Sequence, residues 1–283
     1  MDVFETISAL KDARSTWSHP VGLVPTMGYL HEGHLELVRR ARRESNTVVV
    51  SIFVNPTQFG PSEDLAQYPR SFSDDLARLE AEGVDIVIAP SPEAMYPDGF
   101  STWVEVERVT ATLEGARRPG HFRGVATVCN KLFNMVAPDN AYFGQKDAQQ
   151  VAVIRRMVND LNMNLQIVVV PTIRESDGLA MSSRNIYLGT EERAAATVLY
   201  RALNEARALY QNGERRTDVL RWRMHKTIGT EPLAHLDYAT VVSPADFSET
   251  DFADESSLAV VSARVGRARL IDNIYLSQET GGA

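Results

Sequence analysis

The sequence predicts an α/β fold in which helices cover both faces of a parallel sheet, followed by a smaller α+β domain. Short apolar runs suited to buried strands alternate with segments of helical periodicity, and this alternation stops after Pro171. The predicted strands are 21–24, 48–54, 84–89 and 166–170, and the predicted helices are 34–43, 73–82, 125–136 and 149–161. Right-handed crossovers make this a Rossmann-like sheet, in which ligands bind at the carboxyl ends of the strands.

The second domain begins with a turn at Asp177-Gly178 and a small polar stretch. Long helices are expected at 191–211 and 217–228, and short strands at 236–242, 258–263 and 268–272. We place the boundary near residue 175, which divides the chain into a first domain over 1–175 and a second over 176–283. A length of 283 residues agrees with this division, because one core rarely organises so long a chain.

Composition and charge narrow the class of partners. Hydrophobic residues at 44% and charged residues at 23% are typical of a globular protein. A formal net charge of −8 provides no basic face for nucleic acid or for an anionic membrane. The basic cluster within 215–226 is interleaved with apolar residues, which is typical of a helix with one solvated side. We therefore expect neither nucleic acid nor a membrane as a partner.

Cysteine usage and the amino terminus indicate the compartment. Cys129 is the only cysteine, so no disulfide can form within the chain, and its apolar helical surroundings are typical of a buried thiol. The amino terminus lacks a basic start followed by an apolar core, and the apolar run 48–54 is too short to cross a membrane. These features favour a cytoplasmic location.

The segment from Val21 to His34 has the pattern of a strand, a Pro/Gly turn and the start of a helix. His31 and His34 are one helical turn apart and face the same side, where the first amides of a helix attract anions. This pattern predicts a site for a nucleotide phosphate. The zinc alternative is weaker, because the metalloprotease signature spaces its histidines four apart. A capping or core histidine is the structural alternative, but two histidines around a glycine are harder to explain by packing.

The second strand leaves toward the same crevice with amide side chains. Asn55 and Gln58 follow it, and each amide can both donate and accept hydrogen bonds. Residues 60–73 contain several Pro and Gly breakers and form a long connection, which is typical of a mobile flap over a site.

Two further stretches, 143–150 and 181–185, contain polar residues that packing does not require. Lys146 can neutralise phosphate as a point charge, Arg184 can grip two oxygens with its planar fork, and Asp147 can accept both hydroxyls of a ribose. These stretches also have ordinary structural interpretations: Lys146 as a solvated residue at a helix start, Ser182 and Ser183 as part of a turn, and Arg184 in a surface ion pair. Together with the histidine turn, however, they make a set of groups complementary to a nucleotide.

Family resemblance sharpens this hypothesis. The histidine turn resembles the HxGH signature of the nucleotidyltransferase superfamily, and Met181 to Arg184 resembles the KMSKS loop of those enzymes and of class I aminoacyl-tRNA synthetases. Five segments in this order and spacing resemble the pantothenate synthetase (pantoate–β-alanine ligase) family, and the resemblance spans essentially the whole chain. These segments are Pro25–His34, Phe53–Phe59, Gly120–Gly124, Phe143–Gln150 and Gly178–Asn185.

The resemblance implies a ligase that joins (R)-pantoate to β-alanine with cleavage of ATP, through an enzyme-bound pantoyl adenylate. Pyrophosphate and AMP are released, and Mg²⁺ accompanies ATP. It also implies that the first domain binds ATP and pantoate, that the second closes over the site, and that the protein is a homodimer acting on small molecules in pantothenate biosynthesis. The carboxylate attacks the α-phosphorus in line, so catalysis consists mostly of positioning and charge stabilisation.

The same resemblance implies the roles of individual residues. His34 would be the general acid that assists departure of pyrophosphate, and His31 and Lys146 would stabilise charge on the phosphates. The helix terminus disfavours a positive charge on the rings while phosphates favour it, so either protonation state stays open. Gln58 and Gln150, with Asn55 beside them, would bind pantoate and β-alanine. The remaining ATP-binding positions would be Met27, Gly28, Gly33, Gly144, Gln145, Asp147, Ile173, Met181, Ser182, Ser183 and Arg184.

Other positions have weaker assignments. Asp74 and Asp75 match acidic positions of the family and could approach a metal, but helix N-terminal acids are favoured there anyway. Ala148 departs from the family, which usually has an aromatic residue there, and this departure concerns packing rather than the chemistry. His121 and Arg123 lie in a matching segment without an assigned role, and a salt bridge is the structural interpretation of Arg123.

Two competing functions remain. An adenylyltransferase would use the same first step on a phosphorylated acceptor. Binding the phosphate of such an acceptor calls for more arginine or lysine, whereas the pair Gln58 and Gln150 favours a small carboxylate. A nucleotide-binding regulator without turnover is the other alternative. The intact histidine pair, Lys146 and Arg184 argue against it.

Overall fold

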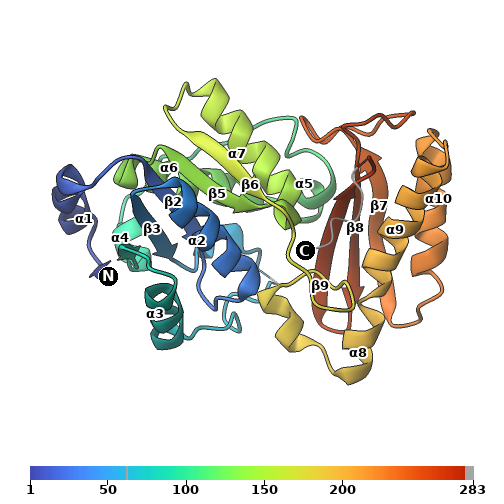
Figure 1. Ribbon diagram of the computed structural model, residues 1–283, viewed down its shortest axis with the longest axis horizontal. Helices are drawn as coiled ribbons and strands as arrows, with labels where there is room; N and C mark the ends of the chain where they lie inside the picture. Colours follow the sequence, from blue (N-terminus) through green and yellow to red (C-terminus); the bar gives the residue numbers. More distant parts are fainter. Residues whose placement is uncertain (62, 278–283) are drawn as a thin grey trace. The chain divides into compact units, whose positions relative to one another are not determined.

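The computed structural model describes residues 1–61 and 63–277, which fall into two compact units (Figure 1). The first unit contains residues 1–144 and 153–171. The second contains residues 145–152 together with those from 172 onward. The segment 145–152, which follows a strand of the first unit and includes the first residues of the next helix, thus groups with the second unit. Among the described residues, no helix has the length and apolar character needed to span a membrane.

The first unit is built on a six-stranded sheet with the order β1-β4-β3-β2-β5-β6, in which every neighbouring pair is parallel. This confirms the predicted parallel sheet. Its central strands are apolar because helices bury both faces, and Val48, Val49 and Val50 are each 0% exposed. The strands are β1 (Asp2–Phe4), β2 (Val21–Thr26), β3 (Thr47–Ile52), β4 (Ile86–Ile88), β5 (Asn140–Gly144) and β6 (Gln166–Val170).

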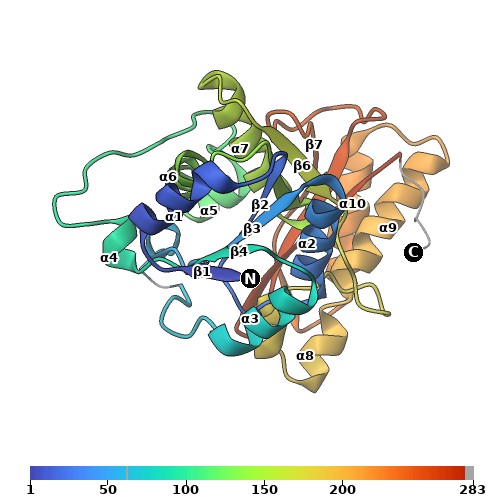
Figure 2. The same cartoon turned by 60° about the vertical axis from the view of Figure 1, so that its left-hand side comes forward.

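Helices lie on both faces of this sheet (Figure 2). On one face α2 (Glu32–Glu44) and α3 (Phe72–Ala81) pack on the strands, and Leu37, Val38 and Leu79 join Val24 and Val50 in one core. On the other face α1 (Ile7–Ala13) and α6 (His121–Val136) contact each other. The shorter elements are η1 (Arg14–Thr16), η2 (Pro56–Gln58), α4 (Pro92–Met95) and α5 (Leu113–Arg117), and α7 (Ala148–Asp160) connects β5 to β6.

The second unit packs helices against a three-stranded antiparallel sheet of order β7-β8-β9. The strands are β7 (Ala234–Val242), β8 (Leu258–Val265) and β9 (Ala268–Tyr275), and the long helices are α9 (Val198–Gln211) and α10 (Thr217–Ile228). The single helix expected over 191–211 is wrong in one respect. It is divided into α8 (Thr190–Ala195) and α9 at Ala196 and Thr197, where the N–H groups of Thr197 and Leu199 donate to carbonyls three residues back, each at 3.3 Å.

Candidate active site

The loop that joins β2 to α2 is fixed by side chains of α3. Asp75 is 2% exposed, and its carboxylate accepts the backbone N–H groups of Tyr29 at 2.8 Å and Leu30 at 2.7 Å. Arg78 donates to the Leu30 carbonyl at 2.9 Å. Gly28 has φ 76°, and a Cβ there would lie 2.9 Å from an Asp75 oxygen, so the turn requires glycine. These contacts hold the loop in one conformation where it leads into the histidines.

The two histidines of the HxGH segment lie at the start of α2. His31 is the N-cap residue, and its Nδ1 accepts the Gly33 N–H at 3.2 Å. The Nδ1 of His34 accepts the His31 N–H at 3.3 Å, and the two ring centroids are 4.0 Å apart. Because a backbone N–H can only donate, both Nδ1 atoms are acceptors, and a neutral ring then carries its proton on Nε2. Each ring is thereby a donor through Nε2.

The turn after β3 brings together three of the predicted residues. Asn55 and Gln58 are 1% and 9% exposed, and Asn55 Nδ2 donates to Gln58 Oε1 at 3.0 Å. Tyr96 donates its hydroxyl proton to Asn55 Oδ1 at 2.9 Å, and Gln58 Nε2 lies 3.4 Å from the sulfur of Met27. The amide of Gln58 therefore has a defined orientation, with its oxygen toward Asn55 and its nitrogen toward Met27.

In the Gly120–Gly124 segment, Arg123 does not make the salt bridge that the sequence suggested. Its guanidinium lies 4.6 Å from the centre of the Trp103 ring, and the described part of the chain gives it no ion pair. The salt bridge is made instead by Arg118, which contacts Glu63 at 2.7 Å, while His121 is buried. Arg118 was missed by sequence reasoning, although it stands in the same Arg-Pro-Gly-His stretch.

The predicted flap over 60–73 includes Ser62, which lies outside the described residues. Elsewhere the segment is attached to the first unit through side chains. Glu63 pairs with Arg118, and Tyr68 is 6% exposed with its ring 5.8 Å from that of Phe59 in an edge-to-face arrangement. Motion of this segment stays a prediction.

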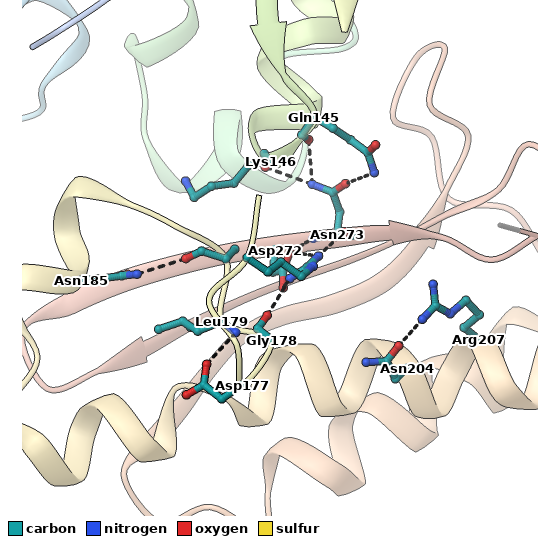
Figure 3. Close-up of polar contacts among 12 residues, drawn as sticks. Gln145, Lys146, Asp177, Gly178, Leu179, Asn185, Asn204, Arg207, Asp272 and Asn273 are labelled. Atoms are coloured by element: carbon teal, nitrogen blue, oxygen red, sulfur yellow. Dashed lines mark hydrogen bonds and ion pairs between the residues drawn. The ribbon is translucent and has the colours of Figure 1, made fainter. Parts of the chain in front are cut away.

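In the second unit, the turn that carries Lys146 is attached to β9 (Figure 3). The turn is η3 (Gln145–Asp147), and Asn273 Nδ2 donates to the carbonyls of Gln145 and Lys146, each at 3.0 Å. Gln145 Nε2 returns a bond to Asn273 Oδ1 at 3.3 Å. Asn273 is 3% exposed, so its amide is committed to this turn. Sequence reasoning missed Asn273, and the available signal was the polar pair Asp272-Asn273 between the apolar residues Ile271 and Ile274.

The segment that precedes the KMSKS-like loop is attached to the same strand. Arg174 makes a bidentate pair with Asp272 at 2.6 and 2.9 Å, donates to the Gly178 carbonyl at 3.1 Å, and stacks on Tyr200 with 4.0 Å to the ring centre. Asp272 is 4% exposed, so the carboxylate of this ion pair is buried. Two neighbouring residues of β9 thus hold both the lysine turn and the entry to the loop (Figure 3).

The loop itself pairs two of the predicted nucleotide-binding residues. The Met181 N–H donates to the Ile173 carbonyl at 2.9 Å, which places the two residues side by side. Ser182 caps η4 (Ser183–Tyr187), since its hydroxyl accepts the Arg184 N–H at 3.3 Å. Asn185 closes the loop by donating to the Ala180 carbonyl at 3.1 Å.

The other predicted residues have less specific surroundings. Gly144 ends β5, and Gln150 is half-buried in the first turn of α7, which Ala148 begins. Lys146 Nζ and Asp147 Oδ1 are 3.8 Å apart, and Asp147 is half-exposed. Gln58 therefore belongs to the first unit, whereas Gln150 and Lys146 belong to the second.

The acidic residues of α3 do not form a preformed metal site. Both oxygens of Asp75 already accept loop N–H groups, and Asp74 pairs with the Ser71 hydroxyl. Within residues 1–61 and 63–277, no three His, Cys, Asp or Glu side chains gather in a way that would hold a metal ion. Sequence reasoning favoured a structural role for Asp75, and its carboxylate fixes the histidine loop.

The parallel sheet, the paired histidines at a helix N-terminus and the serine-rich loop of the second unit define an α/β enzyme of the nucleotidyltransferase type. Comparisons with known proteins identify the family. The sequence model of the pantoate-beta-alanine ligase family matches residues 2–275. The chain belongs to the pantoate-beta-alanine ligase family.

Individual relatives agree with this assignment. The chain is 58% identical to a pantothenate synthetase of Roseiflexus castenholzii, over 98% of this chain and 99% of the relative. It resembles the crystal structure of pantothenate synthetase from Thermus thermophilus, with 47% identity, a TM-score of 0.94 and coverage of 98% and 100%. A pantoate-beta-alanine ligase from Francisella tularensis, complexed with beta-gamma ATP and beta-alanine, has 32% identity, a TM-score of 0.80 and 99% coverage of both chains.

Proposed function

We propose that this protein ligates (R)-pantoate to β-alanine with cleavage of ATP to AMP and pyrophosphate. The observation that carries the proposal is the match of the ligase family to residues 2–275, a range that contains the HxGH and Ser-Ser-Arg segments. The Francisella tularensis relative, complexed with beta-gamma ATP and beta-alanine, supports the nucleotide and the amine. No protein nucleophile is needed, because the substrate carboxylate performs the first attack.

The reaction has two steps that balance without a further reagent. In the first, a carboxylate oxygen of pantoate bonds to the α-phosphorus of ATP, and the bond from that phosphorus to the bridging oxygen of pyrophosphate breaks. In the second, the amine of β-alanine attacks the acyl carbon of the pantoyl adenylate, releases AMP and loses a proton. Each step is accelerated mainly by positioning and by stabilising the charge on oxygen.

The paired histidines suit the departure of pyrophosphate. In this proposal His34 is the general acid and His31 stabilises charge on the phosphates. The structure supports the charge-stabilising part of this proposal: both Nδ1 atoms accept backbone N–H groups, so each neutral ring presents Nε2–H to a phosphate oxygen as a hydrogen-bond donor. A ring whose orientation is fixed by its own backbone loses little freedom when it donates to a phosphate.

Pantoate recognition is assigned to the amides of Gln58 and Gln150, with Asn55 beside Gln58. The defined orientation of the Gln58 amide supports this assignment, since a bound carboxylate or hydroxyl then meets a fixed donor and acceptor. A pocket of this kind rejects analogues that lack a hydroxyl, because its polar groups would be left unsatisfied.

ATP is assigned to both units. Phosphate oxygens are bound by Lys146, Ser182, Ser183 and Arg184, and the ribose by Asp147. The further contacts assigned to the nucleotide come from Met27, Gly28, Gly33, Gly144, Gln145, Ile173 and Met181. Mg²⁺ is carried by the ATP phosphates, since Asp75 is committed to the histidine loop. The proposal also includes a homodimer in the cytoplasm, to be tested by light scattering and by cell fractionation.

The test is to measure products with ATP, pantoate and β-alanine supplied singly and together. We expect pyrophosphate only when ATP and pantoate are both present, and AMP only when β-alanine is added. Pyrophosphate formed without pantoate, or a product in which AMP is joined to a phosphorylated acceptor, would overturn the proposal. Substitution of His34 by Ala should slow adenylate formation far more than it weakens ATP binding, whereas equal losses would indicate a binding protein.

A further inference from the structure

The Arg-Pro-Gly-His stretch lies directly behind the turn that carries Gln58. His121 begins α6 and is 8% exposed, and its Nδ1 lies 2.9 Å from the backbone carbonyl of Gln58. Its Nε2 lies 3.0 Å from Nη1 of Arg118. A guanidinium can only donate, so Nε2 accepts and the ring proton is on Nδ1. His121 therefore donates to the Gln58 carbonyl in a single tautomer.

The arginine that selects this tautomer is itself fixed. Nε and Nη2 of Arg118 each contact a different carboxylate oxygen of Glu63 at 2.7 Å, a bidentate pair, and Nη2 also lies 3.4 Å from the Gln58 carbonyl. Burial, and after it the charge of Arg118, lower the pKa of His121 to about 4, although Glu63 and Glu114 act in the opposite direction. The ring is thus neutral at physiological pH, as the hydrogen bonds require.

A glycine of the same helix allows the turn to approach. A Cβ on Gly124 would lie 2.5 Å from the Thr57 carbonyl oxygen and 2.8 Å from the Gln58 nitrogen, so the backbone of the turn rests directly on α6. The Gly124 carbonyl accepts Asn55 Nδ2 at 3.2 Å. The helix therefore fixes the backbone of the turn, while Asn55 and Met27 fix the Gln58 side chain.

We propose that His121, held in its Nδ1–H tautomer by Arg118, is a positioning residue that fixes the pantoate-binding glutamine Gln58. The inference rests on the proposed function, because it takes Gln58 to be a pantoate ligand. His121 acts through the backbone of Gln58 and does not itself bind substrate. Its loss therefore weakens pantoate binding and leaves ATP binding unchanged.

Replacement of His121 by Asn, Gln and Leu separates positioning from packing. The side-chain nitrogen of Asn matches Nδ1 and keeps the donor to Gln58, whereas Gln places its amide oxygen at the position of Nε2 and keeps only the contact to Arg118. We expect H121Q and H121L to raise the KM for pantoate about tenfold, the size of one lost buried hydrogen bond. H121N should raise it less than about threefold, and all three should leave the KM for ATP within about twofold. His225→Leu is the control for a histidine–carbonyl contact away from this turn, since the exposed His225 lies 3.2 Å from the Ala239 carbonyl in the second unit.

Substitution of Arg118 by Met adds a measurement that a packing role would not change. Without the guanidinium, Glu63 and Glu114 act on the ring without an opposing charge, so its pKa rises from about 4, although burial still lowers it. As pH falls, the KM for pantoate of R118M should then begin to change at a higher pH than the KM of the wild-type protein, apart from any titration of the substrate itself.

The outcomes are distinguishable. If the wild-type protein forms no pantoate-dependent pyrophosphate, the proposed function fails. If Gln58→Ala raises the KM for pantoate but H121Q and H121L do not, or if H121N equals H121L, the positioning role fails while the function stands. A parallel rise in the KM for ATP would also overturn it. If H121L does not fold, the comparison of H121N with H121Q and the pH profile of R118M decide the question.

Discussion

Asn273 is the side chain through which β9 holds the turn of Lys146, and its removal is the sharpest test of how that lysine is positioned. Asn273→Ala deletes two donor contacts of 3.0 Å and one acceptor contact of 3.3 Å. A net contribution of about 1 kcal/mol for each of the two shorter bonds gives about 2 kcal/mol. This corresponds to a loss of about 30-fold in kcat/KM for ATP. Asn273→Asp should lose at least as much, because a carboxylate would face two carbonyl oxygens.

A double-mutant cycle with Lys146→Ala gives the decisive measurement. If Asn273 acts only by placing Lys146, its removal has no further effect once the lysine is gone, and the coupling energy equals the effect of the single Asn273 substitution. The assay is pyrophosphate release under varied ATP with pantoate saturating. Asn204→Ala is the control, since Asn204 pairs with Arg207 on α9 in the same unit (Figure 3). Additive effects in the cycle, or an equal loss in the control, would refute the reasoning.

Three further predictions concern stability. Asp75→Asn removes one of two charged acceptors of loop N–H groups, so the free energy of unfolding in urea should fall by about 1–3 kcal/mol and the KM for ATP should rise; an unchanged urea midpoint would contradict this. Gly178→Ala should destabilise far more than Gly213→Ala, because both have positive φ but only at Gly178 would a Cβ lie 2.2 Å from the Tyr200 ring; equal melting temperatures would show that the ring moves aside. The pKa of His121 lies below its ordinary 6.5, so between the two values the unfolded chain binds more protons than the folded protein. The stability that this residue contributes above pH 6.5, about 3 kcal/mol, is therefore lost as pH falls to about 4. H121N should flatten that dependence in urea titrations at each pH, and an unchanged slope would argue against a neutral buried ring.

Local patterns were sufficient to predict the parallel sheet and the position of the histidines. The valine-rich run of β3 and the spacing of His31 and His34 depend only on neighbouring residues, so a single sequence carries them. The short β1 was not predicted because its three residues are mostly exposed and carry no apolar run. The break between α8 and α9 lies where backbone N–H groups donate to carbonyls three residues back, which apolar periodicity does not encode.

The support of the site could not be predicted in the same way. Asn273 contacts a turn 128 positions earlier in the chain, and no local pattern links the two. For the same reason, the grouping of residues 145–152 with the second unit does not follow from the sequence, since these residues continue directly from a strand of the first. The role of Arg118 depends on Glu63, which lies 55 positions away in the sequence. Arg123 lies inside the segment that resembles the family, yet its guanidinium stacks on Trp103.

The placement of Asp272 and Asn273 on the last strand has a consequence for how the protein is made. A nascent chain that has not yet emerged beyond residue 273 holds the lysine turn and the Arg174 segment without their partners. The first unit, with its histidine loop and the turn of Gln58, is made of residues 1–144 and 153–171. Translation must therefore pass residue 273 before the lysine turn and the Arg174 segment take up their positions, so a nascent chain that stops before that residue lacks the support of groups assigned to the triphosphate.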